Sequence, residues 1–208
     1  MKLRNIRPDS IKSFIDSIKS ELVQDNHLTD DKLRNEYIKG LRSLTTKYHL
    51  TLTLRKGVTE KDAINSLKEF IHRINLKIYN KRYSRDWINS IKGVAVMEDT
   101  IEMETVHFHL MIINDLYLPS KDQFRDKISK AINSEALAIQ EFHLQEYYRS
   151  EEYSLEKYLT KVFESGSLQD AKDRIAAFGI DGIYFGDGRQ LSRFDGSAWK
   201  LPKKLSAR

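Results

Sequence analysis

The chain has 208 residues, of which 40% are hydrophobic and 31% charged, and it contains no cysteine. This composition suits one domain with appendages, and the missing cysteines exclude disulfides and thiolate-bound zinc. The net charge of +5 favours a polyanionic partner such as nucleic acid. Because the sequence shows no apolar run of signal-peptide or membrane-span length, we expect a soluble cytoplasmic protein that is not bound to a membrane.

Residues 1–46 are predicted to form a helical appendage. Apolar residues recur at helical spacing over residues 11–22, after the start signal Pro8-Asp9-Ser10, and again within residues 32–45. The hydrophobic period then changes from that of a helix to that of a strand, so we expect the main domain to begin at residue 47.

Strand and helix patterns alternate from residue 47 to residue 165. In the first predicted strand Leu50, Leu52 and Leu54 alternate with polar residues, which indicates one buried face. Thr59 with Asp62, and later Ser120 with Gln123, form capping-box patterns that open helices. The predicted elements are a strand (48–54), a helix (60–80), strands (93–98 and 106–113), a helix after 120, a strand (136–147) and a short helix (154–164).

This element order predicts an α+β domain. The economical arrangement is a split βαβ fold, with helices against one face of a central, mainly antiparallel sheet. After Gly166 glycines separate short apolar pieces, and the chain ends in basic residues. We therefore expect residues 47–165 to form the core, and residues 166–208 to be a C-terminal extension with a basic tail.

Two histidines in the predicted strand 106–113 carry the main chemical signal. Residues two apart on a strand face the same way, so His107 and His109 share a face while Phe108 points to the core. Such a pair is either two ordinary strand histidines or part of a site for a divalent cation. Glu98, which ends the preceding strand, would complete a site for Mg²⁺ or Mn²⁺ if it pairs near His107. Other candidates for the third ligand are Asp99, Glu102 and Glu104.

Tyr158 and Lys161 form a second candidate pair. They are three residues apart in the predicted short helix and therefore share a face. A tyrosine hydroxyl is a weak nucleophile, but a cation that polarises a phosphate makes attack on that phosphate easier. Lys161 would neutralise the phosphate or assist proton transfer. Packing is the alternative role for one tyrosine among 10.

Together the HFH pair, the upstream Glu98, the TLTL strand and the downstream YLTK resemble the HUH endonucleases over roughly residues 47–165. The resemblance is greatest to single-tyrosine replication initiators of small plasmids and filamentous phages. It implies a ferredoxin-like or palm-like core, with both histidines on a central strand, in which Glu98, His107 and His109 bind the catalytic cation. It also implies that Tyr158 attacks single-stranded DNA at a hairpin origin, leaving a 5′-phosphotyrosine link and a 3′-OH for rolling-circle replication in a bacterial host. No Walker loop is present in the sequence, so unwinding would need a host helicase.

Basic residues near the end of the first long helix are candidate DNA contacts, since cations follow phosphates and neighbouring aromatic rings stack on bases. A solvated helix end is the alternative interpretation. His49 and Thr51 on the first strand are further candidates, and they would lie beside the metal site. The basic candidates are Arg73, Lys77, Lys81, Arg82 and Arg85.

Two alternative functions stay open at this point. A single-tyrosine transposase or a relaxase would use the same chemistry, although such transposases are usually shorter and relaxases commonly carry more histidines. A non-catalytic ferredoxin-like module that binds single-stranded nucleic acid would explain the basic charge. It would not explain why Glu98, His107 and His109 should converge. The sequence predicts no particular oligomeric state.

Overall fold

The computed structural model describes residues 30–80, 90–100, 105–114, 117–133, 137–148, 155–156, 160, 174–179, 182–185 and 190–192. The predicted helix over residues 11–22 therefore lies outside the described residues. The elements are α2 (Asp30–Ser43), β1 (Thr46–Leu54), α3 (Glu60–Tyr79), β2 (Gly93–Thr100), β3 (Thr105–Ile113), α4 (Lys121–Ile132), β4 (Ile139–Glu146), β5 (Ile175–Gly179), β6 (Gly182–Phe185) and β7 (Gln190–Ser192).

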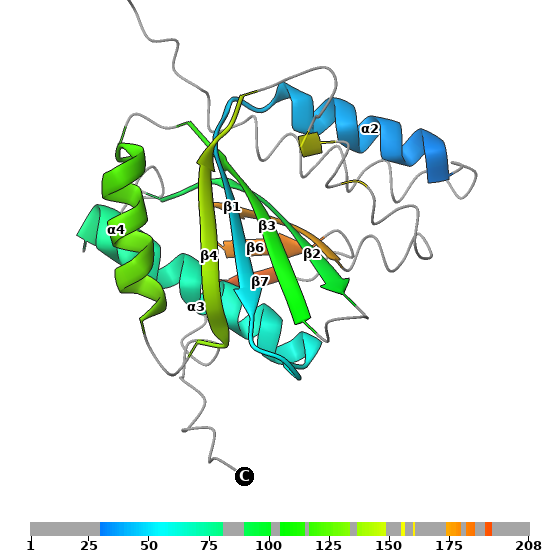
Figure 1. Ribbon diagram of the computed structural model, residues 1–208. Helices are drawn as coiled ribbons and strands as arrows, with labels where there is room; N and C mark the ends of the chain where they lie inside the picture. The colour runs from blue at the N-terminus through cyan, green and yellow to red at the C-terminus, as the bar shows by residue number, and fades with distance from the viewer. Residues whose placement is uncertain are drawn as a thin grey trace, which may run out of the picture.

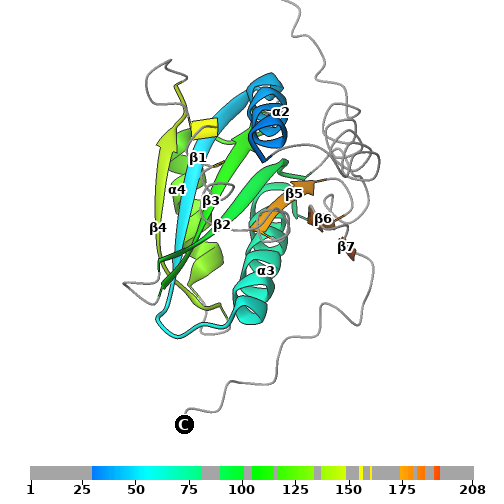
Figure 2. The same ribbon diagram turned by 90° about the vertical axis from the view of Figure 1, so that its right-hand side faces the viewer.

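The strands form one seven-stranded sheet in the order β4-β1-β3-β2-β5-β6-β7, which runs from left to right in Figure 2. The paired strands are antiparallel throughout. Helices α3 and α4 lie on one side of the sheet and α2 lies on the other side (Figure 1). The predicted α+β class with a central antiparallel sheet is therefore confirmed.

Strand β1 follows the two-residue alternation seen in the sequence. Leu50, Leu52 and Leu54 are fully buried in the hydrophobic core, whereas Thr51 and Thr53 are only partly buried. The core also contains the inward faces of α3 and α4, so the leucines face these helices. Since successive strand residues point to opposite faces, the threonines lie on the sheet face away from α3 and α4.

The two long helices on the core side begin differently. At α3 the Thr59 hydroxyl accepts a hydrogen bond from the Asp62 N–H at 3.2 Å and donates to the Asp62 carboxylate at 2.8 Å, so the predicted cap forms. At α4 Ser120 precedes the helix, but its side chain makes no capping bond, so the predicted capping box is wrong there. None of the helices in the described ranges is long and apolar enough to cross a membrane.

The sheet face away from α3 and α4 is apolar in one part and polar in another. On this face β2 and β3 bury Val94, Val96 and Met111, which alternate with residues of the main core. Helix α2 lies on this side in Figure 1, and its Leu41 is buried together with Leu44, which directly follows the helix. The polar part is carried by β1 and β3, where threonines and histidines replace aliphatic side chains.

Strands β5, β6 and β7 were not predicted from the sequence. Strand β5 pairs with β2, from Val96 opposite Ile175 to Gly93 opposite Phe178, and β6 and β7 extend the sheet from there. These strands have five, four and three residues, which is too short for an alternation pattern to be recognised. The unpaired edge of β2 decides their position, because it supplies the hydrogen-bonding partners.

Gly93 is expected to be the glycine that least tolerates a side chain. A Cβ at this position would collide with the carbonyl oxygen of Met111 and lie 2.6 Å from Cζ of the buried Phe178. We expect Gly93→Ala to lower the free energy of unfolding by about 2–3 kcal/mol, because neither neighbour can move easily. Gly179→Ala is the matched control, because its Cβ would meet only the flexible Lys92 side chain, at 3.4 Å. Urea denaturation compares the two, and equal stability of both variants would contradict this account of the packing.

Candidate active site

The predicted metal ligands share one face of the sheet. Strand β3 lies between β1 and β2, and its His107 is paired in register with Thr53 on β1 and Glu98 on β2. His109 is paired with Thr51 on β1 in the same way. Directly paired residues of antiparallel strands point to the same face, so the two histidines and Glu98 lie together there. The predicted pairing of Glu98 near His107 is confirmed.

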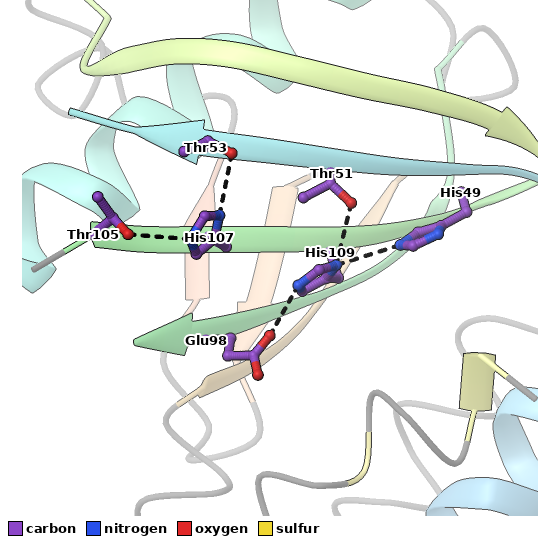
Figure 3. A network of polar contacts seen from close by, with 7 residues as sticks. All are labelled: His49, Thr51, Thr53, Glu98, Thr105, His107 and His109. Atoms are coloured by element: carbon purple, nitrogen blue, oxygen red, sulfur yellow. Dashed lines mark hydrogen bonds and ion pairs between the residues drawn. The ribbon is translucent and has the colours of Figure 1, made fainter. Parts of the chain in front are cut away.

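Glu98 and His109 are in direct contact, as Figure 3 shows. The distance from His109 Nε2 to Glu98 Oε2 is 3.0 Å, and the contact runs diagonally across the strands because Glu98 is in register with His107. The His109 side chain is only 10% exposed, whereas that of Glu98 is 42% exposed. A carboxylate can only accept, so His109 donates its Nε2–H to Glu98.

His107 is held by two threonines. Its Nδ1 lies 3.1 Å from the Thr53 hydroxyl oxygen and its Nε2 lies 3.1 Å from that of Thr105 (Figure 3). Within the described part of the chain, no group of three or more His, Cys, Asp or Glu side chains is arranged to hold a metal ion. The structure thus brings Glu98 and His109 together, and it places His107 beside them with its Nε2 on Thr105.

His49 contacts His109 from β1. Its Nε2 lies 3.4 Å from His109 Nδ1, and the two rings stack with their centroids 5.6 Å apart. On its other side His49 Nδ1 lies 2.8 Å from Gln145 Nε2, an amide nitrogen that can only donate. His49 therefore carries its proton on Nε2. His49 and Thr51 lie directly against His109, as expected from the sequence, and their role as DNA contacts stays a prediction.

Two neighbours of these histidines, Thr105 and Gln145, were not predicted from the sequence. Thr105 is two residues before His107, so strand alternation alone would have placed the two on one face. The Gln145 contact depends on the pairing of β4 with β1, which joins residues far apart in the chain. No local pattern in the sequence indicates that pairing.

Burial keeps the stacked histidines uncharged. It lowers the pKa of His49 to about 4, and the neighbouring His109 and His143 act in the same direction. Burial also lowers the pKa of His109, although the Glu98 carboxylate opposes this effect by raising it. Both rings are therefore neutral at pH 7, which is the form of imidazole that can bind a metal.

The lowered pKa of His49 predicts a loss of stability on acidification. An unfolded histidine titrates near pH 6.5 and folded His49 near pH 4, so between these values the unfolded chain binds more protons and stability rises with pH. From this residue we expect the free energy of unfolding to fall by up to about 2 kcal/mol between pH 7 and pH 5. Urea denaturation in the presence of EDTA, at pH 7 and at pH 5, measures this change in the free energy of unfolding. A His49→Gln variant with the full wild-type pH dependence would contradict the prediction.

Of the other predicted residues, the described Arg73 and Lys77 are not brought to this face. Arg73 and Lys77 lie on α3, which packs against the opposite face of the sheet, and Arg73 Nε contacts Glu69 Oε1 at 2.6 Å. Their layer is therefore separated from His109 by the sheet. The predicted functional residues outside the described part of the chain are the alternative ligands Glu102 and Glu104, together with Lys81, Arg82, Arg85, Tyr158 and Lys161.

Glu156 and Thr160 lie on either side of Tyr158 in the sequence. Both are fully buried and form hydrogen bonds. Tyr147 Oη, just after β4, donates to Glu156 Oε2 at 2.7 Å. Arg34 Nε on α2 donates to the Thr160 hydroxyl oxygen at 3.4 Å. The described piece 155–156, yellow in Figure 1, lies beside α2, on the side of the sheet that carries the histidines.

A scan against protein-family models and searches of curated proteins and of solved structures found no significant match to this chain.

Proposed function

We propose that this protein is a metal-dependent endonuclease and strand transferase that nicks and rejoins single-stranded DNA at an origin to start rolling-circle replication. The observation that carries the proposal is the contact of 3.0 Å between Glu98 Oε2 and His109 Nε2, with His107 in register beside Glu98. These residues lie on the sheet face away from the main core, and the Glu98 side chain there is 42% exposed. A DNA substrate also agrees with the net charge of +5.

We further propose that β1–β4 with α3 and α4 form a ferredoxin-like or palm-like core. The element order β1-α3-β2-β3-α4-β4 and the spatial order β4-β1-β3-β2 support this, because each helix then connects two strands that have a third strand between them. His107 and His109 lie on β3, one of the two inner strands of that four-stranded unit.

The donor set fits a divalent cation. His109 Nε2 and Glu98 Oε2 are adjacent, and Mg²⁺ and Mn²⁺ accept oxygen ligands together with imidazole nitrogen. His107 would become the third ligand, and its Nε2 would give up the hydrogen bond to the Thr105 hydroxyl. A cation bound there would hold and polarise the scissile phosphate, stabilising the charge that develops during attack.

Tyr158 is the proposed nucleophile. Its hydroxyl oxygen forms a bond to the phosphorus while the bond from phosphorus to the 3′ oxygen breaks. The 3′ oxygen takes up a proton and leaves as a free 3′-OH, and the 5′ phosphate stays on the tyrosine. Lys161 would neutralise the phosphate or assist transfer of the tyrosine proton. Attack of a 3′-OH on the phosphotyrosine reverses these changes and rejoins the strand.

The composition of the sheet face favours this proposal over a non-catalytic binding module. Sheets that bind single-stranded nucleic acid without chemistry stack bases on aromatic side chains of the inner strands. Here the inner strands β1 and β3 present His49, Thr51, Thr53, His107 and His109 on the polar face, without Phe, Tyr or Trp, and Glu98 Oε2 occupies His109 Nε2 at 3.0 Å. A transposase or relaxase would use the same residues, so the preferred DNA substrate has to separate it from a replication initiator.

The experiment is incubation of the full chain with a library of labelled single-stranded and hairpin oligonucleotides, with Mn²⁺ or with EDTA. We expect a covalent protein–DNA adduct with a subset of hairpin oligonucleotides, only when the cation is present, together with a product whose 3′-OH a polymerase can extend. Absence of an adduct across the library would overturn the proposal. Preference for transposon ends or transfer origins would favour the alternative biology.

A further inference from the structure

Each histidine of the candidate site has a threonine hydroxyl at its Nδ1. The distances are 3.2 Å from His109 Nδ1 to the Thr51 oxygen and 3.1 Å from His107 Nδ1 to the Thr53 oxygen (Figure 3). The two pairs follow one another on the same face of the β1–β3 ladder, where each threonine lies directly opposite its histidine. One arrangement is thus used twice within the site.

The Nε2 atoms of the two rings are turned away from β1. His109 Nε2 meets Glu98 Oε2 at 3.0 Å, and His107 Nε2 meets the Thr105 hydroxyl at 3.1 Å. Both rings therefore present Nδ1 to β1 and keep Nε2 for other partners. A ring without a partner at Nδ1 could turn over and exchange the two nitrogens.

A hydroxyl suits this position because it can both donate and accept a hydrogen bond. Without metal, His109 carries its proton on Nε2, so its Nδ1 accepts from the Thr51 hydroxyl at 3.2 Å and from His49 Nε2–H at 3.4 Å. A histidine that binds a cation through Nε2 carries its proton on Nδ1, which then needs an acceptor. His49 cannot accept, because Gln145 leaves its proton on Nε2. The Thr51 hydroxyl can serve in both states.

We propose that Thr51 and Thr53 are positioning residues, which orient His109 and His107 so that both Nε2 atoms are available to one divalent cation. The proposal rests on the proposed function in one respect, namely that this site binds a cation. It gives Thr51 a different role from the DNA contact expected from the sequence. Partners of this kind typically change metal affinity by about 10–100-fold.

The test is Mn²⁺ binding to the full chain, measured by calorimetry without DNA. Thr51→Val and Thr53→Val keep the side-chain volume but remove the hydroxyl, and we expect each to raise the dissociation constant at least about tenfold. Thr51→Ser and Thr53→Ser should stay within about threefold of wild type. Thr45→Val, at an exposed position just before β1, is the matched control and should bind as wild type does.

A second measurement keeps the test valid where a valine variant is less stable. Nitrogen-15 NMR of the folded protein reports which ring nitrogen of His107 and His109 carries the proton. We expect the valine variants to change the proportions of the two tautomers of His107 and His109. The serine variants should leave these proportions unchanged. Unchanged tautomers together with unchanged Mn²⁺ affinity in the valine variants would overturn the positioning role.

The outcomes separate this proposal from the proposed function. If wild type and valine variants bind Mn²⁺ equally and wild type still forms the DNA adduct, only the positioning role fails. If Mn²⁺ binding depends on the two hydroxyls but no oligonucleotide forms an adduct, only the proposed function fails. Failure of the wild-type protein to bind Mn²⁺ would overturn both.

Discussion

Replacing His109 with alanine is expected to abolish Mn²⁺ binding and to reduce covalent adduct formation on the order of a thousandfold or more. His109 is the histidine already in contact with Glu98, so its loss removes one of the two donors that the fold brings together. His143→Ala is the matched control. His143 lies on β4 opposite Thr51, at an exposed position of the same face. It should retain wild-type activity.

A second variant guards against an effect of His109→Ala on folding, since His109 is 8% exposed and alanine leaves a small cavity. Glu98→Gln keeps the size of the side chain at a position that is 42% exposed, and it removes the negative charge that a cation needs. We expect the same loss of Mn²⁺ binding with little change in thermal unfolding. Full adduct formation by both variants would refute the proposed cation site.

Tyr158→Phe is expected to abolish the covalent adduct while leaving Mn²⁺ affinity unchanged. Phenylalanine keeps the ring but removes the oxygen that would form the bond to phosphorus, so no adduct can form at this position. Tyr153→Phe, five residues earlier in the chain, is the control and should form the adduct normally. Peptide mass spectrometry of the wild-type adduct should find the nucleotide on Tyr158. An adduct that survives in Tyr158→Phe would rule out this residue as the nucleophile.

The His109 and Tyr158 variants divide the proposed reaction into two parts. Loss of His109 should remove both metal binding and the adduct, whereas loss of the Tyr158 hydroxyl should remove the adduct alone. The bonds of Glu156 to Tyr147 and of Thr160 to Arg34 attach the neighbours of Tyr158 to the side of the sheet that carries His109.

The sequence was a good guide wherever a repeating pattern is local. Leu50, Leu52 and Leu54 showed the buried face of β1, and the same two-residue period placed His107 and His109 together on β3. The sequence was a poor guide at helix ends and in short strands. Ser120 precedes α4 without capping it, and β5–β7 were missed because a few residues cannot display a period.

By itself, then, the sequence determined the fold class, the face that carries the histidines and the candidacy of Glu98 as their partner. These depend on alternation along single strands and on one hairpin between neighbouring strands. Only the tertiary structure decided that Glu98 contacts His109 instead of His107, that His49 stacks on His109, and that Thr51 and Thr53 meet the histidine rings. The physical reason is that the contacts of His49, Thr51 and Thr53 depend on the register of β1 with β3, and the contact of Glu98 depends on how its side chain turns across β2 and β3. Residues about 60 positions apart in the chain form that register, and no local pattern encodes it.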